Sequence, residues 1–394
     1  MPLNDSYESI YERANKLASE RQWEQAIGEY TRIFDRLGKL GPDTRRKHPG
    51  FVDIFMRTSI ELVSLLIRME EYDRTIAVME QAIAYDPANA VMWRREIARS
   101  QIQQGKAEEG LSELEAISVE HKDAYGALVL GESYLFLKDI DRATTHLTEA
   151  ARLAESSQTF NVRALAYRHL FEIYASTGDV PKAIQVWQMA GGFDESAVID
   201  AKAVYELFLQ RGDTDGARAL MMSDPDQMRK GLYRGLVNLR EGDGDAARQQ
   251  WARVAQRELD VDKDDIGCWA EAGLRAGEAR RVVEKLAPVL LSSARSDLHA
   301  SVLLAIALAT LGETQQADVI LQTLRDTAAW TRNDRFGIRY WQLLDELADD
   351  AVKAALRHHF VGIDAPADGS PVDDAAANPV APAPADEATP VTEV

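Results

Sequence analysis

The sequence predicts an all-α protein built as a stack of helical hairpins. Apolar residues recur at three- and four-residue intervals from residue 7 to 361, which is the spacing of amphipathic helices. The Asn-Gly and Asp-Gly turns that indicate β-hairpins are missing between alternating apolar runs, and Asp243-Gly244 lies between two helical patterns. A motif also recurs about every 34 residues, and a period of this length is typical of repeat folds.

The recurring motif is a helix-turn-helix whose second helix carries a small residue near its start. Two clear copies are Leu130-Gly131-x-x-Tyr134 with Ala143, and Leu304-Ala305-x-x-Leu308 with Ala317. We expect the small residue to lie where the two helices cross most closely, where a larger side chain would cost about 1–3 kcal/mol. This marker occurs at Ala26, Thr75, Gly110, Ala143, Ala183, Ala217, Ala247, Val282 and Ala317, at intervals of 49, 35, 33, 40, 34, 30, 35 and 35 residues.

On these residues the chain resembles the tetratricopeptide-repeat (TPR) family, with nine repeats over about residues 7 to 330. The resemblance implies a right-handed α-solenoid, in which each hairpin completes the core of the next. Asp86-Pro87-Ala88-Asn89 matches the family's turn between repeats. Six repeats also place a glycine at the turn between their two helices, where a left-handed residue ends the first helix: Gly105, Gly178, Gly212, Gly242, Gly277 and Gly312.

Local irregularities and composition divide the chain into three parts. The stretch AGGFDES after Met189, and a short second helix ending in Met221-Met222-Ser223-Asp224-Pro225, predict a joint between an N-terminal half, 1–190, and a C-terminal half, 191–361. Residues 334–361 predict two capping helices that close the last apolar surface. Residues 362–394 hold seven acidic residues, six of the 13 prolines and no Lys, Arg or aromatic residue, so we expect a disordered acidic tail.

The charge and the cysteine count exclude several classes of protein. The net charge is −19, and the seven tail acids leave −12 on residues 1–361, so we expect no binding to nucleic acid or to an anionic membrane surface. A single cysteine, Cys268, forms neither an intramolecular disulfide nor a thiolate zinc cage. The first residues show no signal-peptide pattern, and no apolar run approaches the roughly 20 residues of a membrane helix. These features predict a cytoplasmic protein.

Motifs for catalysis are missing, and the nearest metal motif is imperfect. The sequence contains no phosphate-binding loop, nucleophile elbow or His-Glu-x-x-His pair. Asp260-x-Asp262-x-Asp264 has the spacing of a calcium loop, but Asp265 stands where that loop needs glycine, which favours helix-capping aspartates instead. We interpret His358-His359 as a surface pair without a third ligand, and Cys268 as a packing residue. We therefore predict a non-enzyme with no catalytic residue, metal or cofactor.

The resemblance places a partner site on the concave face, which the first helices of the repeats build. The family's groove positions here carry arginines, acids and aromatic residues, a composition typical of interface hot spots. The alternative is that these arginines and glutamates pair with each other across adjacent helices. The candidate partner-binding residues are Arg57, Arg95, Arg99, Tyr125, Glu132, Phe136, Arg168 and His169.

A second basic group, Arg45-Arg46-Lys47-His48, lies in a predicted loop between Gly38 and Gly50. It is either a solvated loop or a contact for an acidic partner or for the protein's own tail.

The resemblance implies a non-catalytic scaffold or adaptor that binds a peptide or helix of a partner protein. The alternative is a peptide-sensing regulatory repeat protein that controls a signalling or transcription partner. The acid-binding clamp of tetratricopeptide co-chaperones is not expected, because Glu61 stands at the matching position of the second repeat and would repel a carboxylate. A homo-oligomer and an intramolecular contact of the tail stay open.

Overall fold

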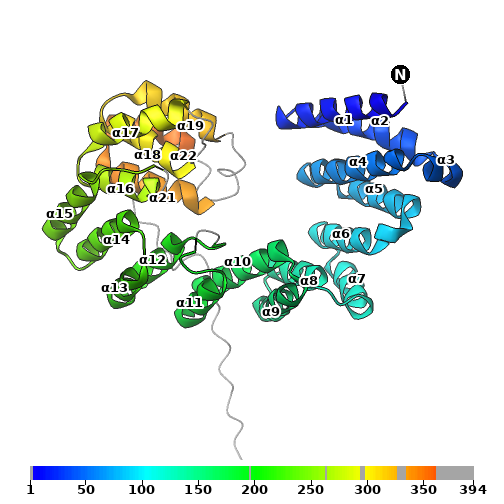
Figure 1. The fold of residues 1–394 in the computed structure, drawn as a ribbon, viewed down its shortest axis with the longest axis horizontal. Coiled ribbons are helices and arrows are strands. Elements are labelled where there is room, and N and C mark those ends of the chain that lie inside the picture. Colours follow the sequence, from blue (N-terminus) through cyan, green and yellow to red (C-terminus); the bar gives the residue numbers. More distant parts are fainter. Residues whose placement is uncertain (1–2, 195–196, 262–263, 293–297, 326–333, 361–394) are drawn as a thin grey trace, which may run out of the picture. The chain divides into compact units, whose positions relative to one another are not determined.

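The computed structural model describes residues 3–194, 197–261, 264–292, 298–325 and 334–360 (Figure 1). Every element in these ranges is a helix, which confirms the predicted all-α repeat fold. Contacts divide the chain into two compact units, Met1–Leu207 (unit 1) and Phe208–Val394 (unit 2). This division falls inside α12 (Ala201–Gln210), and the halves 1–190 and 191–361 stay a prediction. The predicted tail, 362–394, lies outside the described residues.

Unit 1 is a series of hairpins in chain order. Within it, the second helix of each hairpin packs against the first helix of the next hairpin (Figure 1). The first helices of three successive hairpins also touch: α6 contacts α8, and α8 contacts α10. The hairpins are α1 (Leu3–Ser19) with α2 (Trp23–Gly38), α4 (Pro49–Arg68) with α5 (Tyr72–Tyr85), α6 (Ala90–Gln103) with α7 (Ala107–Glu120), α8 (Ala124–Phe136) with α9 (Ile140–Ser157), and α10 (Phe160–Thr177) with α11 (Val180–Met189). A short 3-10 helix, η1 (Pro87–Asn89), forms the predicted turn between the second and third repeats.

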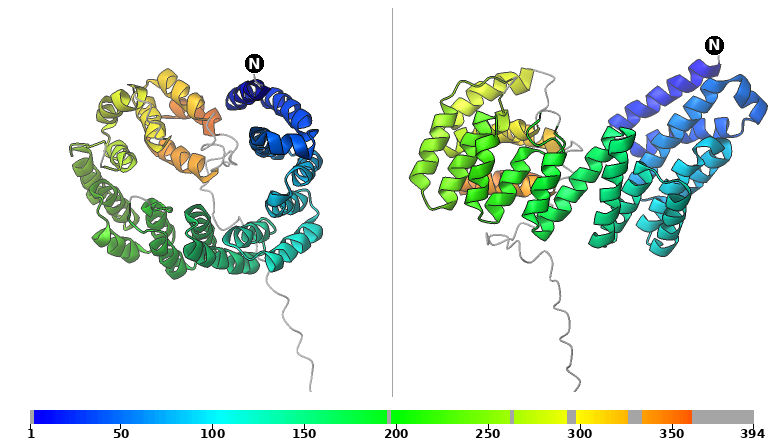
Figure 2. Two further views of the ribbon diagram at one scale, coloured as in Figure 1. Left: turned by 45° about the vertical axis from the view of Figure 1, so that its right-hand side comes forward. Right: turned by 60° about the horizontal axis from the view of Figure 1, so that its bottom comes forward.

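Unit 2 continues the same pattern and ends in the predicted capping pair. Both views in Figure 2 show its helices following one another in chain order. The helix α18 is apolar nearly all round and buried, and it contacts α21, while α19 contacts α22. The helices after α12 are α13 (Thr214–Ser223), α14 (Gln227–Arg240) with α15 (Gly244–Ala255), α16 (Ile266–Arg275) with α17 (Ala279–Ser292), α18 (Leu298–Thr310) with α19 (Thr314–Arg325), and α21 (Asp334–Leu347) with α22 (Asp350–Phe360).

The predicted marker residues are buried in every repeat. Each of the nine, from Ala26 to Ala317, lies on the second helix of its hairpin and is shielded from solvent. Gly110 shows why the residue must be small: a Cβ there would overlap the carbonyl oxygen of Ala98 on the partner helix α6. Close helix crossings therefore set the repeat period that the sequence displays.

In each of the nine repeats, the turn between the two helices holds a left-handed residue. The six predicted glycines all have positive φ, from +70° at Gly212 to +93° at Gly105. In the three repeats without glycine the position is filled by Arg21, Glu70 and Lys138, with φ of 60°, 59° and 62°. The hairpin geometry thus demands this conformation even where the side chain disfavours it.

The predicted loop from Gly38 to Gly50 is not a loop throughout, which corrects the sequence prediction. It contains α3 (Pro42–Lys47), which starts with proline in its first turn, a favourable position because proline has no N–H to satisfy there. Arg45 lies 4.4 Å above the Tyr85 ring and donates to the Tyr85 carbonyl oxygen. Arg46 pairs with Asp43 in the same helix. Arg45 is therefore held against α5 and is not presented to a partner.

Among the described residues, no helix combines the length and apolar character needed to cross a membrane.

Candidate partner-binding face

The helix α8 is buried around most of its surface and exposes a single stripe. Its described side chains are largely shielded from solvent, but Tyr125 is 38% exposed and Phe136 is 58% exposed. Glu132, which is partly exposed, lies between them at a spacing that keeps all three on one side of the helix. We call Tyr125, Glu132 and Phe136 the α8 stripe. All three are candidate residues from the sequence.

Polar side chains link α6 to the α8 stripe. The Tyr125 hydroxyl donates to Glu96 Oε1 at 2.7 Å. Arg99 Nη2 lies 3.3 Å from Glu132 Oε2, and Arg99 Nη1 lies 4.0 Å from Glu96 Oε2. The guanidinium of Arg99 is thus shared between a carboxylate of its own helix and one of the next first helix.

A histidine on α10 continues these contacts on the other side of Glu132. His169 Nε2 lies 3.3 Å from Glu132 Oε1, and its Nδ1 lies 3.6 Å from Glu172 Oε2. Three successive first helices are therefore joined by one series of polar contacts. We call this series the charged network; its members are Glu96, Arg99, Tyr125, Glu132, His169 and Glu172.

The charged network keeps His169 and Glu132 ionised. The hydrogen bond to Glu132 and the nearby carboxylate of Glu172 raise the pKa of His169 to about 9, so the imidazole is positively charged at neutral pH. Burial by itself would raise the pKa of Glu132, but His169 and Arg99 outweigh it and hold that pKa below its usual range. The carboxylates of Glu96, Glu132 and Glu172 then face two cations, Arg99 and His169. The network therefore carries one excess negative charge.

Arg95 is buried beneath this face, so the structure does not present it to a partner. Only 5% of it is exposed, and its Nη2 donates to Asp123 Oδ2 at 2.8 Å and to the His121 carbonyl oxygen at 3.1 Å. The same Asp123 caps α8 by accepting from the Gly126 N–H. A Cβ on Gly126 would lie 2.8 Å from Arg95 Nη2, so the glycine makes room for the guanidinium. Arg95 holds α6 to the start of α8.

Arg57 and Arg168, two further candidate residues, are not part of the charged network. The Arg57 guanidinium, on α4, forms a bidentate ion pair with Glu8 of α1, with Nη1–Oε1 at 3.1 Å and Nη2–Oε2 at 2.9 Å. It also pairs with Asp53 of its own helix. Its guanidinium lies 4.8 Å from the Tyr11 ring. Arg168 is exposed on α10, and the described residues provide it with no ion pair. The predicted arginines are thus mostly paired across adjacent helices, as the alternative interpretation proposed.

Sequence reasoning selected Arg99, Glu132 and His169 but not Glu96 and Glu172, the other two acidic residues of the charged network. Glu96 and Glu172 also occupy groove positions, on the helices that carry Arg99 and His169, so the repeat pattern could have identified them. Asp123 was also missed, although an aspartate directly before an apolar helix is typical of a cap. Its pairing with Arg95 has no local signal, because the two residues are separated by a whole hairpin.

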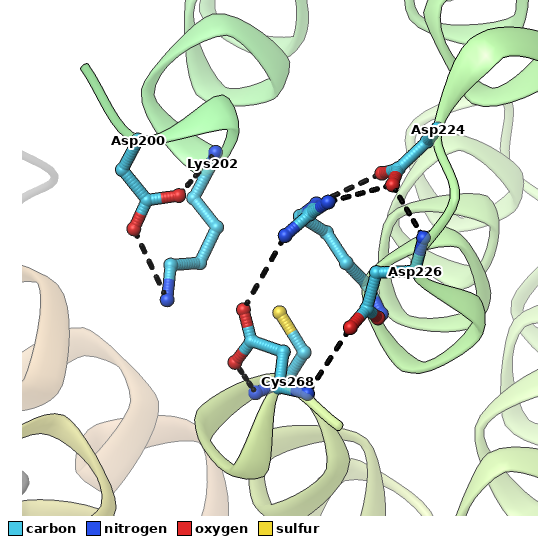
Figure 3. Close-up of polar contacts among 7 residues, drawn as sticks. Asp200, Lys202, Asp224, Asp226 and Cys268 are labelled. Carbon is cyan, nitrogen blue, oxygen red and sulfur yellow. Dashed lines mark hydrogen bonds and ion pairs between the residues drawn. The ribbon is translucent and has the colours of Figure 1, made fainter. Parts of the chain in front are cut away.

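Unit 2 contains a buried ionic cluster that the sequence did not indicate (Figure 3). The Arg229 guanidinium donates to both oxygens of Asp224, at 2.6 and 2.8 Å, and its Nη1 lies 3.8 Å from Asp265 Oδ2. The Asp265 N–H donates to Asp226, which caps α14. Asp265 itself caps α16 by accepting from the Cys268 N–H, as predicted for this acidic stretch. Cys268 is buried, in agreement with a packing role.

A group of potential metal ligands lies at the end of unit 2, and it corrects the interpretation of His358-His359. His359 is only 2% exposed, so the two histidines are not a surface pair. Asp318 of α19 supplies the third side chain that the sequence did not reveal, with its Oδ1 at 2.7 Å from His359 Nε2 and 3.4 Å from His358 Nε2. The sequence could not show this group, because 40 residues separate Asp318 from His358.

No family model matches the sequence, and no curated protein matches it. Among solved structures, the chain is similar to a tetratricopeptide repeat protein from Parabacteroides merdae, at 12% identity over 66% of this chain and 95% of that chain, with a TM-score of 0.33. It is similar to the APC/C hetero-tetramer Cut9-Hcn1, at 15% identity over 86% and 76%, with a TM-score of 0.28. A third likeness is to the TPR domain of P58(IPK), at 13% identity over 90% and 99%, with a TM-score of 0.23. The repeat architecture is visible in the chain's own markers, turns and helix contacts.

Proposed function

We propose that this stack of tetratricopeptide repeats is a non-catalytic scaffold that binds a peptide or helix of a partner protein along the α8 stripe. The observation that carries the proposal is the exposure of Tyr125 and Phe136 on a helix that is otherwise buried. Aromatic side chains contribute large contact areas at low entropic cost, which makes them frequent anchors of interfaces. Phe136 is 58% exposed and Tyr125 is 38% exposed, so part of each ring is accessible to a partner.

The charged network indicates the chemistry of the partner. Arg99 is already paired with Glu132 and Glu96, so it has little capacity left for an acidic ligand. The network carries one excess negative charge, and Glu172 is its most exposed carboxylate. We therefore favour a peptide that places an apolar side chain against Phe136 and Tyr125 and carries Lys or Arg beside it.

The test begins with a selection of peptides from a random-sequence display library against the full chain. The affinity of a selected peptide is then measured for the wild type, for Phe136→Ala and for Phe160→Ala by calorimetry. We expect Phe136→Ala to weaken binding at least tenfold, because an anchor side chain is removed. Phe160 is the matched control, since it is also an exposed aromatic residue, 51% exposed, but lies at the start of α10.

Two results would contradict the proposal. One is equal binding of the selected peptides to the wild type and to Phe136→Ala. The other is a selection that yields only acidic peptides without apolar residues, which would move the site to another surface such as that around the exposed Arg168.

The remaining expectations are part of this proposal. The net charge of −19 supports a protein partner rather than nucleic acid or an anionic membrane. A cytoplasmic location is still a prediction. A contact of the tail, 362–394, with the protein itself and a homo-oligomer are still predictions. The contact with Arg45 loses support, because Tyr85 already holds that side chain.

A further inference from the structure

We propose that Asp318, His358 and His359 form a binding site for a divalent transition-metal ion, with Zn²⁺ as the occupant. The three side chains can each offer one ligand atom, and these atoms lie within 4.8 Å of one another. Around a tetrahedral ion with bonds of about 2.0–2.2 Å, ligand atoms lie roughly 3.3–3.6 Å apart. The 3.4 Å from Asp318 Oδ1 to His358 Nε2 matches that spacing. The 2.7 Å from Asp318 Oδ1 to His359 Nε2 is the length of a hydrogen bond, which a bound ion would replace by widening this pair by about 0.6–0.9 Å.

The hydrogen bond of His358 favours the tautomer that binds metals. His358 Nδ1 lies 2.9 Å from the Ala355 carbonyl oxygen, which can only accept, so Nδ1 carries the proton. In the neutral ring this leaves the lone pair on Nε2, the atom that faces Asp318. Histidine ligands of metals are typically oriented by this kind of bond from the second ring nitrogen to a carbonyl or carboxylate.

Both histidine Nε2 atoms converge on the same carboxylate oxygen of Asp318. The two rings are close to each other, with centroids 3.9 Å apart. With an ion bound, each Nε2 would provide a lone pair and Asp318 Oδ1 a negative charge.

The ligand types select the class of metal. Two imidazoles and one carboxylate suit Zn²⁺, Co²⁺ or Ni²⁺, whereas Mg²⁺ and Ca²⁺ prefer sites made of oxygen ligands. Asp318 and His358 are about half exposed, which gives an ion access from solvent, and His359 is buried and fixed in place. Three protein ligands leave one coordination position for water.

The site would join two elements that are separate in sequence. Asp318 lies on α19, the second helix of the ninth repeat, and both histidines lie in the last turn of α22. A bound ion would therefore fasten the capping helix to the last repeat of unit 2. This role does not depend on the α8 stripe, which lies in unit 1.

The experiment uses the untagged full chain, stripped with a chelator. Zn²⁺ is titrated by calorimetry, and Co²⁺ by visible absorption, which reports the coordination geometry. We expect one ion per chain, and at least a tenfold loss of affinity for both Asp318→Asn and His358→Gln. Both changes are at partly exposed positions, so circular dichroism should confirm that the fold is kept. The matched control is His121→Gln, which removes an exposed histidine of unit 1 and should leave binding unchanged.

Thermal unfolding gives a second readout. Zn²⁺ should raise the unfolding temperature of the wild type but not of Asp318→Asn, since a ligand that binds only the folded state stabilises it. Mg²⁺ at the same concentration should have no effect. A stoichiometry far below one, or equal affinities for the wild type and both variants, would show that the three side chains form only an ion pair.

Discussion

Arg95 and Arg99 lie one helical turn apart on α6, yet they have different environments. The Arg95 guanidinium is buried and holds the Asp123 cap of α8, whereas the Arg99 side chain is 38% exposed within the charged network. Removing a buried cation leaves its anionic partner without an opposite charge, which is costly. Surface ion pairs, by contrast, contribute little to the free energy of unfolding.

We therefore expect Arg95→Ala to lower the local free energy of unfolding by about 1–3 kcal/mol, less than for a fully buried pair because Asp123 is half exposed. Arg99→Ala should lower it by less than about 1 kcal/mol. Native-state hydrogen exchange of amides in α6 and α8 measures both. Equal losses for the two variants would contradict this difference in role.

His169 should make unit 1 sensitive to pH. Its pKa in the folded protein is about 9, raised from an ordinary value of 6.5 by Glu132 and Glu172. A raised pKa means that the folded state holds the proton more tightly than the unfolded state. The stabilisation is therefore complete below about pH 6.5 and is lost as the pH rises through 9.

The measurement compares the wild type with His169→Gln at pH 6 and at pH 9.5. We expect the wild type to be more stable than the variant at pH 6, and this advantage to shrink by pH 9.5. An NMR titration of the His169 ring should show a midpoint near 9. A midpoint near 6.5, or a constant advantage, would argue against the network.

At the scale of the element, the turns between paired helices hold residues in an unfavourable conformation. Lys138, between α8 and α9, has φ of 62°, which costs about 1–2 kcal/mol for a residue with a Cβ. We expect Lys138→Gly to stabilise this hairpin by roughly 0.5–1 kcal/mol, after the greater flexibility of glycine in the unfolded chain is deducted.

The control is Lys106→Gly in the turn between α6 and α7. Lys106 is also exposed but has φ of −90°, so glycine offers no relief there and should be neutral or destabilising. Thermal unfolding of both variants tests the prediction. A gain for Lys106→Gly as large as that for Lys138→Gly would show that the left-handed conformation is not the cause.

At the scale of the whole molecule, a stack of repeats has stability that is set mainly by neighbouring hairpins. The buried Asp224–Arg229 pair joins the turn after α13 to α14, and Asp265 extends it to α16. We expect Asp224→Ala to cost about 3–5 kcal/mol locally, because it leaves Arg229 buried without its main partner. Amide exchange should accelerate in α13 to α16 and stay unchanged in α1 to α5.

The matched control for this prediction is Asp245→Ala, which removes an exposed acid paired with Arg248 on α15. Its effect should stay within about 0.5 kcal/mol. Faster exchange throughout the chain in Asp224→Ala would mean that the repeats unfold as one cooperative body, contrary to the nearest-neighbour behaviour expected of a solenoid.

The helices, their pairing into hairpins and the repeat period follow from the sequence, because they depend on local properties. Small residues such as Ala143 mark the helix crossings, and glycines such as Gly178 mark six of the nine turns, whatever the rest of the chain does. The helix α3 was missed because six residues provide too short a pattern.

The pairing of polar side chains was decided by the tertiary structure. The sequence placed Arg95 and Arg99 on one face, and only packing buried Arg95 against Asp123 and left Arg99 partly exposed. In the same way, Asp318 reaches His359 across a distance in sequence that no local pattern spans, since side-chain partners are chosen by the three-dimensional contact of separate helices.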